Sequence, residues 1–281
     1  MNLLSFQSRV AYGYVGNSIA VPVLQRLGHE TWPVDTTALS NHLAYPTHTG
    51  RFLPPAEVAA VVNGLAKLGL FGRLDAMLSG FLGEAATVAA EAADRLRAES
   101  PAAIYCLDPV MGERVGGLYV RPSTAEAIAG LLLPRADLLL PNAFELDHLA
   151  GMRCRSLSDV IAAAESLRLR ARPGALVIAT GLEREDGPKD RIEVLALAAD
   201  RRWLGEAPRV AVEAFGGGDL FSALFLSHYL ATHDVPQALA RSLDSAHAVF
   251  ARTIGRKELA LIESLDVLAN PPELAQLRRL L

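Results

Sequence analysis

The sequence has few of the features that mark disulfide-rich, metal-binding or membrane proteins. Only two cysteines occur among 281 residues, Cys106 and Cys154, and they form no metal-binding or redox motif. Two reduced thiols in a cytoplasmic protein are the simplest interpretation. No run of 18 apolar residues occurs, so no transmembrane helix is predicted. The first six residues lack the basic and apolar segments of a secretion signal.

Charge and histidine content also exclude classes of function. The net charge is −4, and residues of both signs are interspersed, unlike the basic face of a nucleic-acid-binding protein. We therefore expect no nucleic acid or membrane as a partner. The seven histidines are scattered, and His228 and His233 lie five apart on a predicted helix, where they point to different faces. A histidine-based metal site is not expected.

Common nucleotide-binding and hydrolase motifs are absent. There is no Gly-x4-Gly-Lys-Ser/Thr, which argues against a P-loop protein. Gly13 and Gly16 lack the glycine spacing of a dinucleotide site. No Gly-x-Ser-x-Gly occurs, which argues against an α/β-hydrolase.

The sequence does contain alternating strand and helix patterns along most of its length. About half of the residues are apolar, enough for a large core. The alternation predicts an α/β protein with a central, mostly parallel sheet and helices on both faces. No linker divides the chain, so residues 1–281 are predicted to form a single domain. Residues 192–203 indicate an antiparallel addition at the sheet edge, residues 40–55 a polar loop, and residues 272–281 a terminal helix.

Four polar clusters follow predicted strands. They are residues 7–8, 108–109, 142–145 and 180–181. In parallel sheets the chemistry sits at the carboxyl ends of the strands. We therefore expect these clusters to lie together.

The most informative stretch is the glycine-rich sequence at residues 215–221 (FGGGDLF), which leads into an apolar helix. Three glycines leave backbone N–H groups uncovered, and a helix start adds partial positive charge, so the segment suits an anion such as a phosphate. Asp219 follows directly, where it could take a proton from an attacking alcohol. The competing interpretation is a glycine-rich turn in which Asp219 only caps the helix.

Seven motifs together resemble the vitamin B6 kinases of the ribokinase superfamily, whose fold is a three-layer α/β sandwich. The match runs from residue 3 to about residue 255 and rests on residues 7–9 (QSR), 12–18 (YGYVGNS), 40–42 (SNH), 79–81 (SGF), 108–112 (DPVMG), 142–145 (NAFE) and 216–219 (GGGD). The resemblance implies transfer of the γ-phosphate of ATP to the 5′-hydroxymethyl group of pyridoxal and related vitamers. It also implies a homodimer.

The same resemblance implies a role for each matching residue. Asp219 would be the base, and the amides of Gly216, Gly217 and Gly218 would form the anion hole. Mg²⁺ would be the cofactor, near Asp108 and Glu145, because acidic residues beside ATP require a metal between them. The ATP-binding residues would be Asp108, Asn142, Glu145, Thr180, Gly181 and Gly218. The substrate would be contacted by Ser8, Val15, His42, Leu43, Phe81 and Asp219.

Each role has a structural alternative. Asp108 can simply end a strand, and Glu145 can be a helix N-terminal charge. Ser8 can be a turn residue, Phe81 and Val15 ordinary packing, and Thr180 a strand-end hydroxyl. The 40–55 loop can be a flap that excludes water or a segment without a role.

Leu43 departs from the family pattern, in which Ser-Asn-His is often followed by a threonine that contacts the ring. Leucine cannot make that hydrogen bond, and this favours a first alternative, a ribokinase-like kinase for another hydroxymethyl heterocycle such as hydroxymethylpyrimidine. A second alternative, of a different class, is a protein that binds pyridoxal without catalysis. The intact Asp219, Asp108 and Glu145 argue against it. Phe81 is often tyrosine in the family, and the segment between Pro208 and Gly216 has few polar residues for holding a nucleotide.

Overall fold

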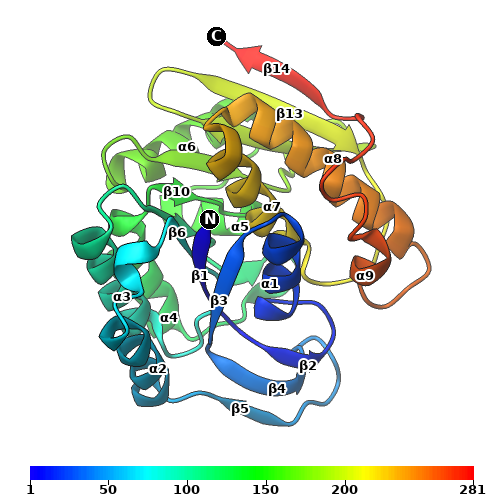
Figure 1. Ribbon diagram of the computed structural model, residues 1–281. Coiled ribbons are helices and arrows are strands. Elements are labelled where there is room, and N and C mark those ends of the chain that lie inside the picture. Colours follow the sequence, from blue (N-terminus) through cyan, green and yellow to red (C-terminus); the bar gives the residue numbers. More distant parts are fainter.

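A nine-stranded sheet runs through the molecule, and the computed structural model describes all of residues 1–281 (Figure 1). Six neighbouring strands are parallel, and three antiparallel strands extend one edge. In spatial order the strands are β14 (Gln276–Leu280), β13 (Arg202–Pro208), β12 (Arg191–Leu197), β11 (Leu176–Ala179), β10 (Leu138–Leu139), β7 (Ile104–Leu107), β6 (Ala76–Ser79), β1 (Asn2–Gln7) and β3 (Glu30–Asp35).

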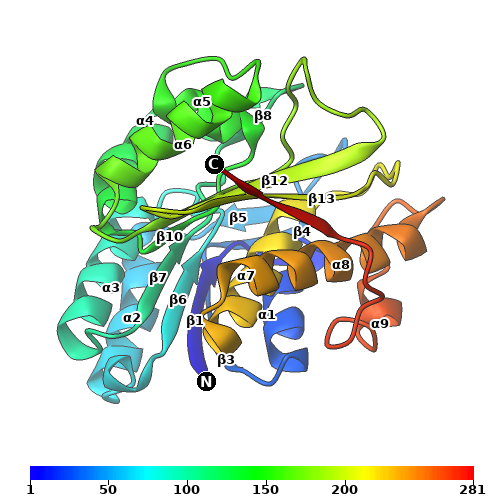
Figure 2. The ribbon, with the colours of Figure 1, turned by 90° about the horizontal axis from the view of Figure 1, so that it is seen from above.

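Helices cover both faces of this sheet (Figure 2). One layer contains α2 (Pro55–Lys67), α3 (Ala86–Glu99), α4 (Pro122–Ala127), α5 (Ala143–Ala150) and α6 (Leu157–Arg170). The other contains α1 (Asn17–Arg26), α7 (Gly217–Thr232), α8 (Val235–Thr253) and the short α9 (Leu261–Ser264). None of these helices is long and apolar enough to cross a membrane.

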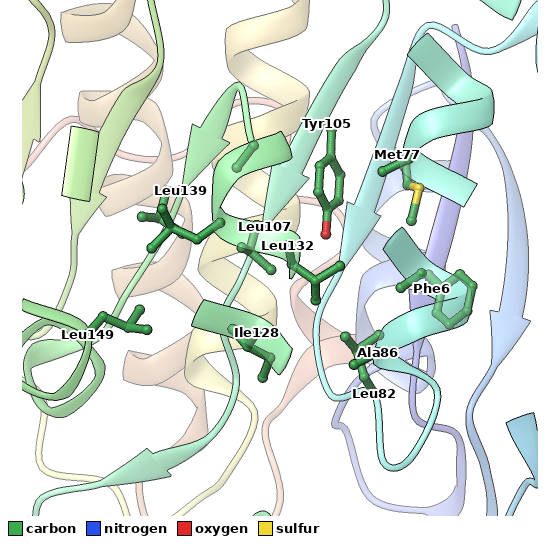
Figure 3. Close-up of a cluster of buried hydrophobic side chains, with 14 of the residues drawn as sticks. Phe6, Met77, Leu82, Ala86, Tyr105, Leu107, Ile128, Leu132, Leu139 and Leu149 are labelled. Carbon is green, nitrogen blue, oxygen red and sulfur yellow. The ribbon is translucent and has the colours of Figure 1, made fainter. Parts of the chain in front are cut away.

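Two hydrophobic cores form because side chains alternate along each buried strand. In β7, Tyr105 and Leu107 pack into the core beneath α3 and α4, whereas Cys106 packs into the core beneath α7 and α8. In β10, Leu139 packs into the first of these cores and Leu138 into the second. Figure 3 shows the first core, in which Tyr105, Leu107 and Leu139 lie near side chains of the covering helices.

A small three-stranded sheet lies beside the carboxyl ends of the parallel strands. It comprises β2 (Val10–Tyr12), β4 (Thr37–Asn41) and β5 (Gly50–Phe52), with β4 parallel to β2 and antiparallel to β5. A two-stranded hairpin, β8 (Gly112–Glu113) and β9 (Gly117–Leu118), follows β7. The loop predicted at residues 40–55 is thus partly strand, and its tip joins β4 to β5.

The architecture confirms the predicted α/β class, with a mostly parallel central sheet and helices on both faces. The antiparallel edge near residues 192–203 is also confirmed. The predicted terminal helix at residues 272–281 is wrong, because residues 276–280 form β14, which pairs with β13. The leucine spacing there suits a helix as well as a strand, and the strand conformation lets this segment pair with the backbone groups at the edge of β13, which would otherwise be unpaired.

Candidate active site

A cavity of about 470 Å³ lies at the carboxyl ends of the parallel strands. It is bordered by residues that follow β1, β7, β10 and β11, by the start of α7, and by the loop after β4. Thirteen predicted site residues line it: Ser8, Val15, His42, Leu43, Phe81, Asp108, Asn142, Glu145, Thr180, Gly216, Gly217, Gly218 and Asp219. The fold therefore brings segments from both halves of the chain into one cavity.

The start of α7 forms one wall of the cavity. Gly216 is the N-cap of the helix, at a φ of +89°. A Cβ atom at Gly216 would lie 1.9 Å from the carbonyl oxygen of Tyr14, so only glycine fits. The first N–H groups of a helix have no acceptor within it and carry partial positive charge. The start of α7 therefore offers backbone N–H groups as hydrogen-bond donors to an anion in the cavity.

Asp219 lies on the first turn of α7 and faces the same cavity. Its Oδ2 atom accepts a hydrogen bond from the backbone N–H of Gly16, at 3.0 Å. No side chain caps α7, so the interpretation of Asp219 as a helix cap is wrong. The side chain is partly accessible from the cavity, but the surrounding protein excludes most water from it. This desolvation raises the pKa of Asp219 to about 6, although the hydrogen bond from the Gly16 N–H lowers the pKa in part.

Asp108 directly follows β7 and is 5% exposed. Ser222, one turn beyond Asp219 on α7, donates a hydrogen bond to its Oδ2 atom at 2.6 Å. Burial raises the pKa of Asp108 to about 8, the nearby charge of Asp219 adds to this rise, and the Ser222 hydroxyl opposes it. Asp108 and Asp219 therefore lie close together in the cavity, near the start of α7.

Glu145 lies on the first turn of α5, where it is 2% exposed. It forms a capping box with Asn142, whose backbone N–H donates to Oε2 at 2.9 Å. The backbone N–H of Met111 donates to Oε1 at 3.0 Å. Burial, followed by the charge of Asp108, raises the pKa of Glu145 above its ordinary range. The helix-terminal interpretation of Glu145 is thus confirmed, and the same carboxylate also lines the cavity.

A divalent cation suits this acidic group only together with a phosphate ligand. No set of three or more His, Cys, Asp or Glu residues is arranged to hold a metal ion. Mg²⁺ commonly takes one or two carboxylates and completes its shell with water and phosphate oxygens. Asp108 keeps Oδ1 free of hydrogen bonds, whereas both oxygens of Glu145 already accept N–H groups. The donor set therefore fits a direct contact from Asp108 and a water-mediated one from Glu145.

The opposite wall suits a flat ring. Ser8 and His42 are mostly buried, whereas Leu43 is 39% exposed at the rim. Val15 and Phe81 contribute apolar surface. The combination is an apolar slot with a few polar groups, which is the general form of a small-molecule site.

Thr180 and Gly181 differ in their placement. Thr180 follows β11, forms an isolated parallel bridge with Asn142, and lines the cavity. Gly181 is not among the lining residues. Its role in ATP binding remains a prediction from the resemblance.

Residues that the sequence patterns did not single out also line the cavity. Ser222 could have been found from helical spacing, because it lies three residues after Asp219 on the same face. Tyr119 follows the β8–β9 hairpin and has no such signal, whereas Phe215 belongs to the glycine-rich stretch at residues 215–221, whose pattern assigns it no role. Glu258, near the C-terminus, accepts hydrogen bonds from the segments around this cavity and belongs to no motif.

The sheet order, the glycine-rich start of α7 and the acidic residues beside it define a ribokinase-like small-molecule kinase. A family model described as phosphomethylpyrimidine kinase matches residues 58–259. The pyridoxal kinase PdxY of Rubrobacter xylanophilus is 39% identical over 283 residues, which cover 99% of this chain and 97% of that protein. PdxY of Deinococcus radiodurans is 38% identical, over 97% of this chain and 94% of its own length.

The chain also resembles a solved structure, the pyridoxal kinase from Leishmania donovani in complex with ADP and pyridoxamine. The TM-score is 0.92 at 26% identity, and the match covers 100% of this chain and 99% of the other. The chain belongs to the pyridoxal kinase family. This result confirms the resemblance that the sequence motifs indicated.

Proposed function

We propose that this kinase transfers the γ-phosphate of ATP to the 5′-hydroxymethyl group of pyridoxal and related B6 vitamers, giving pyridoxal 5′-phosphate. The observation that carries the proposal is the position of Asp219, beside the N-terminus of α7 in the cavity that also holds a ring-sized apolar slot. The names of the relatives support the choice of vitamer class.

In the proposed reaction Asp219 accepts the proton of the 5′-hydroxyl group as its oxygen attacks the γ-phosphorus. The bond between the γ-phosphorus and the β,γ-bridging oxygen breaks, and ADP leaves with that electron pair. The amides of Gly216, Gly217 and Gly218 stabilise the negative charge of the transferring group. Such transfer depends on positioning and charge stabilisation rather than on covalent catalysis.

Asn142, Thr180 and Gly181 complete the proposed nucleotide site, together with Asp108 and Glu145. Mg²⁺, bound with ATP, would neutralise phosphate charge. Asp108 would contact the ion directly and Glu145 through water, in keeping with their hydrogen bonds. Burial raises the pKa of both carboxyls, and a neighbouring carboxylate adds to each rise, Asp219 for Asp108 and Asp108 for Glu145, which supports a site that gains stability when a cation enters.

On the substrate side, Val15 and Phe81 would contact the two faces of the ring. Ser8 and His42 would supply polar contacts, and Leu43 would cover the rim. A single domain over residues 1–281, a homodimer and a cytoplasmic location belong to the same proposal.

The test is phosphate transfer from Mg-ATP, followed by mass spectrometry. The acceptors are pyridoxal, pyridoxine, pyridoxamine, hydroxymethylaminopyrimidine and ribose. A phosphorylated B6 vitamer supports the proposal. A second candidate function is a pyrimidine kinase, which the description of the matching family model and the presence of Leu43 in the cavity support. Phosphorylation of the pyrimidine alone would indicate this second function. Binding of pyridoxal without any product would indicate a non-catalytic binding protein.

Replacing Leu43 with threonine is expected to lower KM for pyridoxal by about fivefold, because one added hydrogen bond contributes about 1 kcal/mol. Leu43→Val is the matched control, since valine has the shape of threonine without the hydroxyl group. Steady-state kinetics of both variants check the prediction. Equal KM values for the two variants would mean that the hydroxyl group at residue 43 makes no useful contact.

The pKa of about 6 for Asp219 predicts an acidic limb in the pH dependence of kcat/KM for pyridoxal. A base must be ionised, so activity is present above this pKa and falls as the pH decreases through about 6. Initial rates at saturating Mg-ATP measure this pH dependence of kcat/KM, and circular dichroism confirms that the protein stays folded at each pH. A profile that stays flat through this range would exclude a base with this pKa.

A further inference from the structure

One carboxylate near the C-terminus connects three segments that surround the substrate side of the cavity. Glu258 lies between α8 and α9, and its side chain is only 12% exposed. Its Oε1 atom accepts a hydrogen bond from the hydroxyl group of Tyr45 at 2.6 Å and lies 3.1 Å from Nε2 of His42. Its Oε2 atom accepts the backbone N–H of Tyr14 at 3.2 Å.

Two of these contacts hold the loop that connects β4 to β5. His42 and Tyr45 lie on either side of Leu43 and Ala44, and both of these intervening residues line the cavity. The ring of His42 also packs against Phe215, with ring centroids 5.1 Å apart, immediately before the glycines. Glu258 therefore fixes the loop against the wall that would receive the phosphate.

The third contact holds the turn before α1. Two residues after Tyr14, the backbone N–H of Gly16 donates to Asp219. The carbonyl oxygen of Tyr14 packs against Gly216, so this turn touches both the proposed base and the helix N-cap. Glu258 thus positions the backbone on which Asp219 depends, although it does not line the cavity itself.

The packing around Glu258 indicates a fixed carboxylate rather than a mobile surface charge. Its neighbour Leu259 is 2% exposed and anchors the segment in the core. A Cβ atom at Gly13 would lie 2.8 Å from Oε2 of Glu258, so the turn and the carboxylate are in close contact. Hydrogen bonds to an ionised group are stronger than neutral ones.

We infer that Glu258 is a positioning residue that holds the 42–45 loop and the 14–16 turn in the geometry that receives the vitamer. The inference rests on the proposed function for its kinetic consequence, but its structural consequence can be measured without turnover. Because the three partners lie on the substrate side, loss of the carboxylate should affect the vitamer more than ATP.

The experiment compares Glu258→Ala and Glu258→Gln with the wild-type enzyme. Glu263→Gln is the matched control, since Glu263 lies five residues further along, is exposed, and has a side chain that pairs only with Arg256. Glu258→Ala is expected to raise KM for pyridoxal at least about tenfold, with KM for ATP changed less than about twofold. Glu258→Gln keeps an acceptor for Tyr45 and should give an intermediate KM.

Hydrogen exchange on the enzyme without substrates supplies the independent readout. In Glu258→Ala the amides of residues 12–16 and 40–50 should exchange faster, while the amides of β6 and β7 should be unchanged. Tyr45→Phe should have a smaller effect on KM, and combining it with Glu258→Ala should add little, because both remove the same contact.

Unchanged KM and unchanged exchange in Glu258→Ala would overturn the inference. Equal increases in both KM values, with faster exchange throughout the sheet, would also overturn it by indicating general loss of stability. Absence of phosphorylation by the wild-type enzyme would instead contradict the proposed function, while the exchange result would still decide the structural part.

Discussion

Replacing Asp219 with asparagine is expected to reduce kcat at least about 10²-fold while leaving the fold intact, as removal of a general base should. Asparagine has nearly the same shape, and its side-chain oxygen can still accept the hydrogen bond from the Gly16 N–H. It cannot accept the proton of the substrate hydroxyl group. Single-turnover phosphorylation of pyridoxal, with thermal unfolding measured in parallel, checks the prediction.

The thermal midpoint of Asp219→Asn should equal or exceed that of the wild type. Desolvation disfavours the charged carboxylate at this position, and the neutral amide avoids that cost. Glu213→Gln is the control, because Glu213 is an exposed acidic residue shortly before the glycines. Turnover near the wild-type rate in Asp219→Asn would exclude Asp219 as the base.

The second large effect is expected from Gly216→Ala. The added Cβ atom would lie 1.9 Å from the carbonyl oxygen of Tyr14, at a φ of +89° that alanine rarely adopts. The turn at residues 14–16 or the start of α7 must therefore move. A displacement of about 1 Å at a catalytic constellation can cost about 10²-fold in rate. We expect at least this loss of kcat/KM, together with a lower thermal midpoint.

Gly28→Ala separates the two causes of that effect. Gly28 has the same φ of +89°, but a Cβ atom there would meet nothing within 4 Å. It lies between α1 and β3, at the amino end of the strand and away from the cavity. Gly28→Ala should lose stability from backbone strain and keep its activity. If Gly216→Ala behaves in the same way, close packing against Tyr14 is not required for the reaction.

Much of the fold follows from patterns within short segments. The strands that carry Leu107 and Leu139 are apolar on both sides; Asp108 directly follows the first, and Asn142 follows the second after Leu140 and Pro141. This order predicts both a buried parallel sheet and the edge at which the cavity lies. The sequence therefore predicted that Asp108 and Asn142 lie close together, and the structure brings both to the cavity.

Features that depend on distant partners could not be predicted in this way. The segment that forms β14 has leucines at spacings compatible with a helix, and the edge of β13 decides its conformation. Glu258 lies more than 200 residues from His42 and Tyr45, so no local pattern connects them. Gly181 follows a strand in the expected manner, but the chain turns there and Gly181 does not line the cavity.

The two sides of the cavity have different structural origins. The side proposed for phosphate transfer is built on the central sheet and on α7, most of whose side chains are buried between the sheet and α8. The side proposed for the ring is built partly on the small sheet β2-β4-β5 and its connecting loop, and partly from Ser8 and Phe81, which follow β1 and β6 of the central sheet. Substitutions in that small sheet can alter which ring is accepted without disturbing the core that supports α7. The preference for one vitamer over another can thus change during evolution independently of the chemistry of transfer.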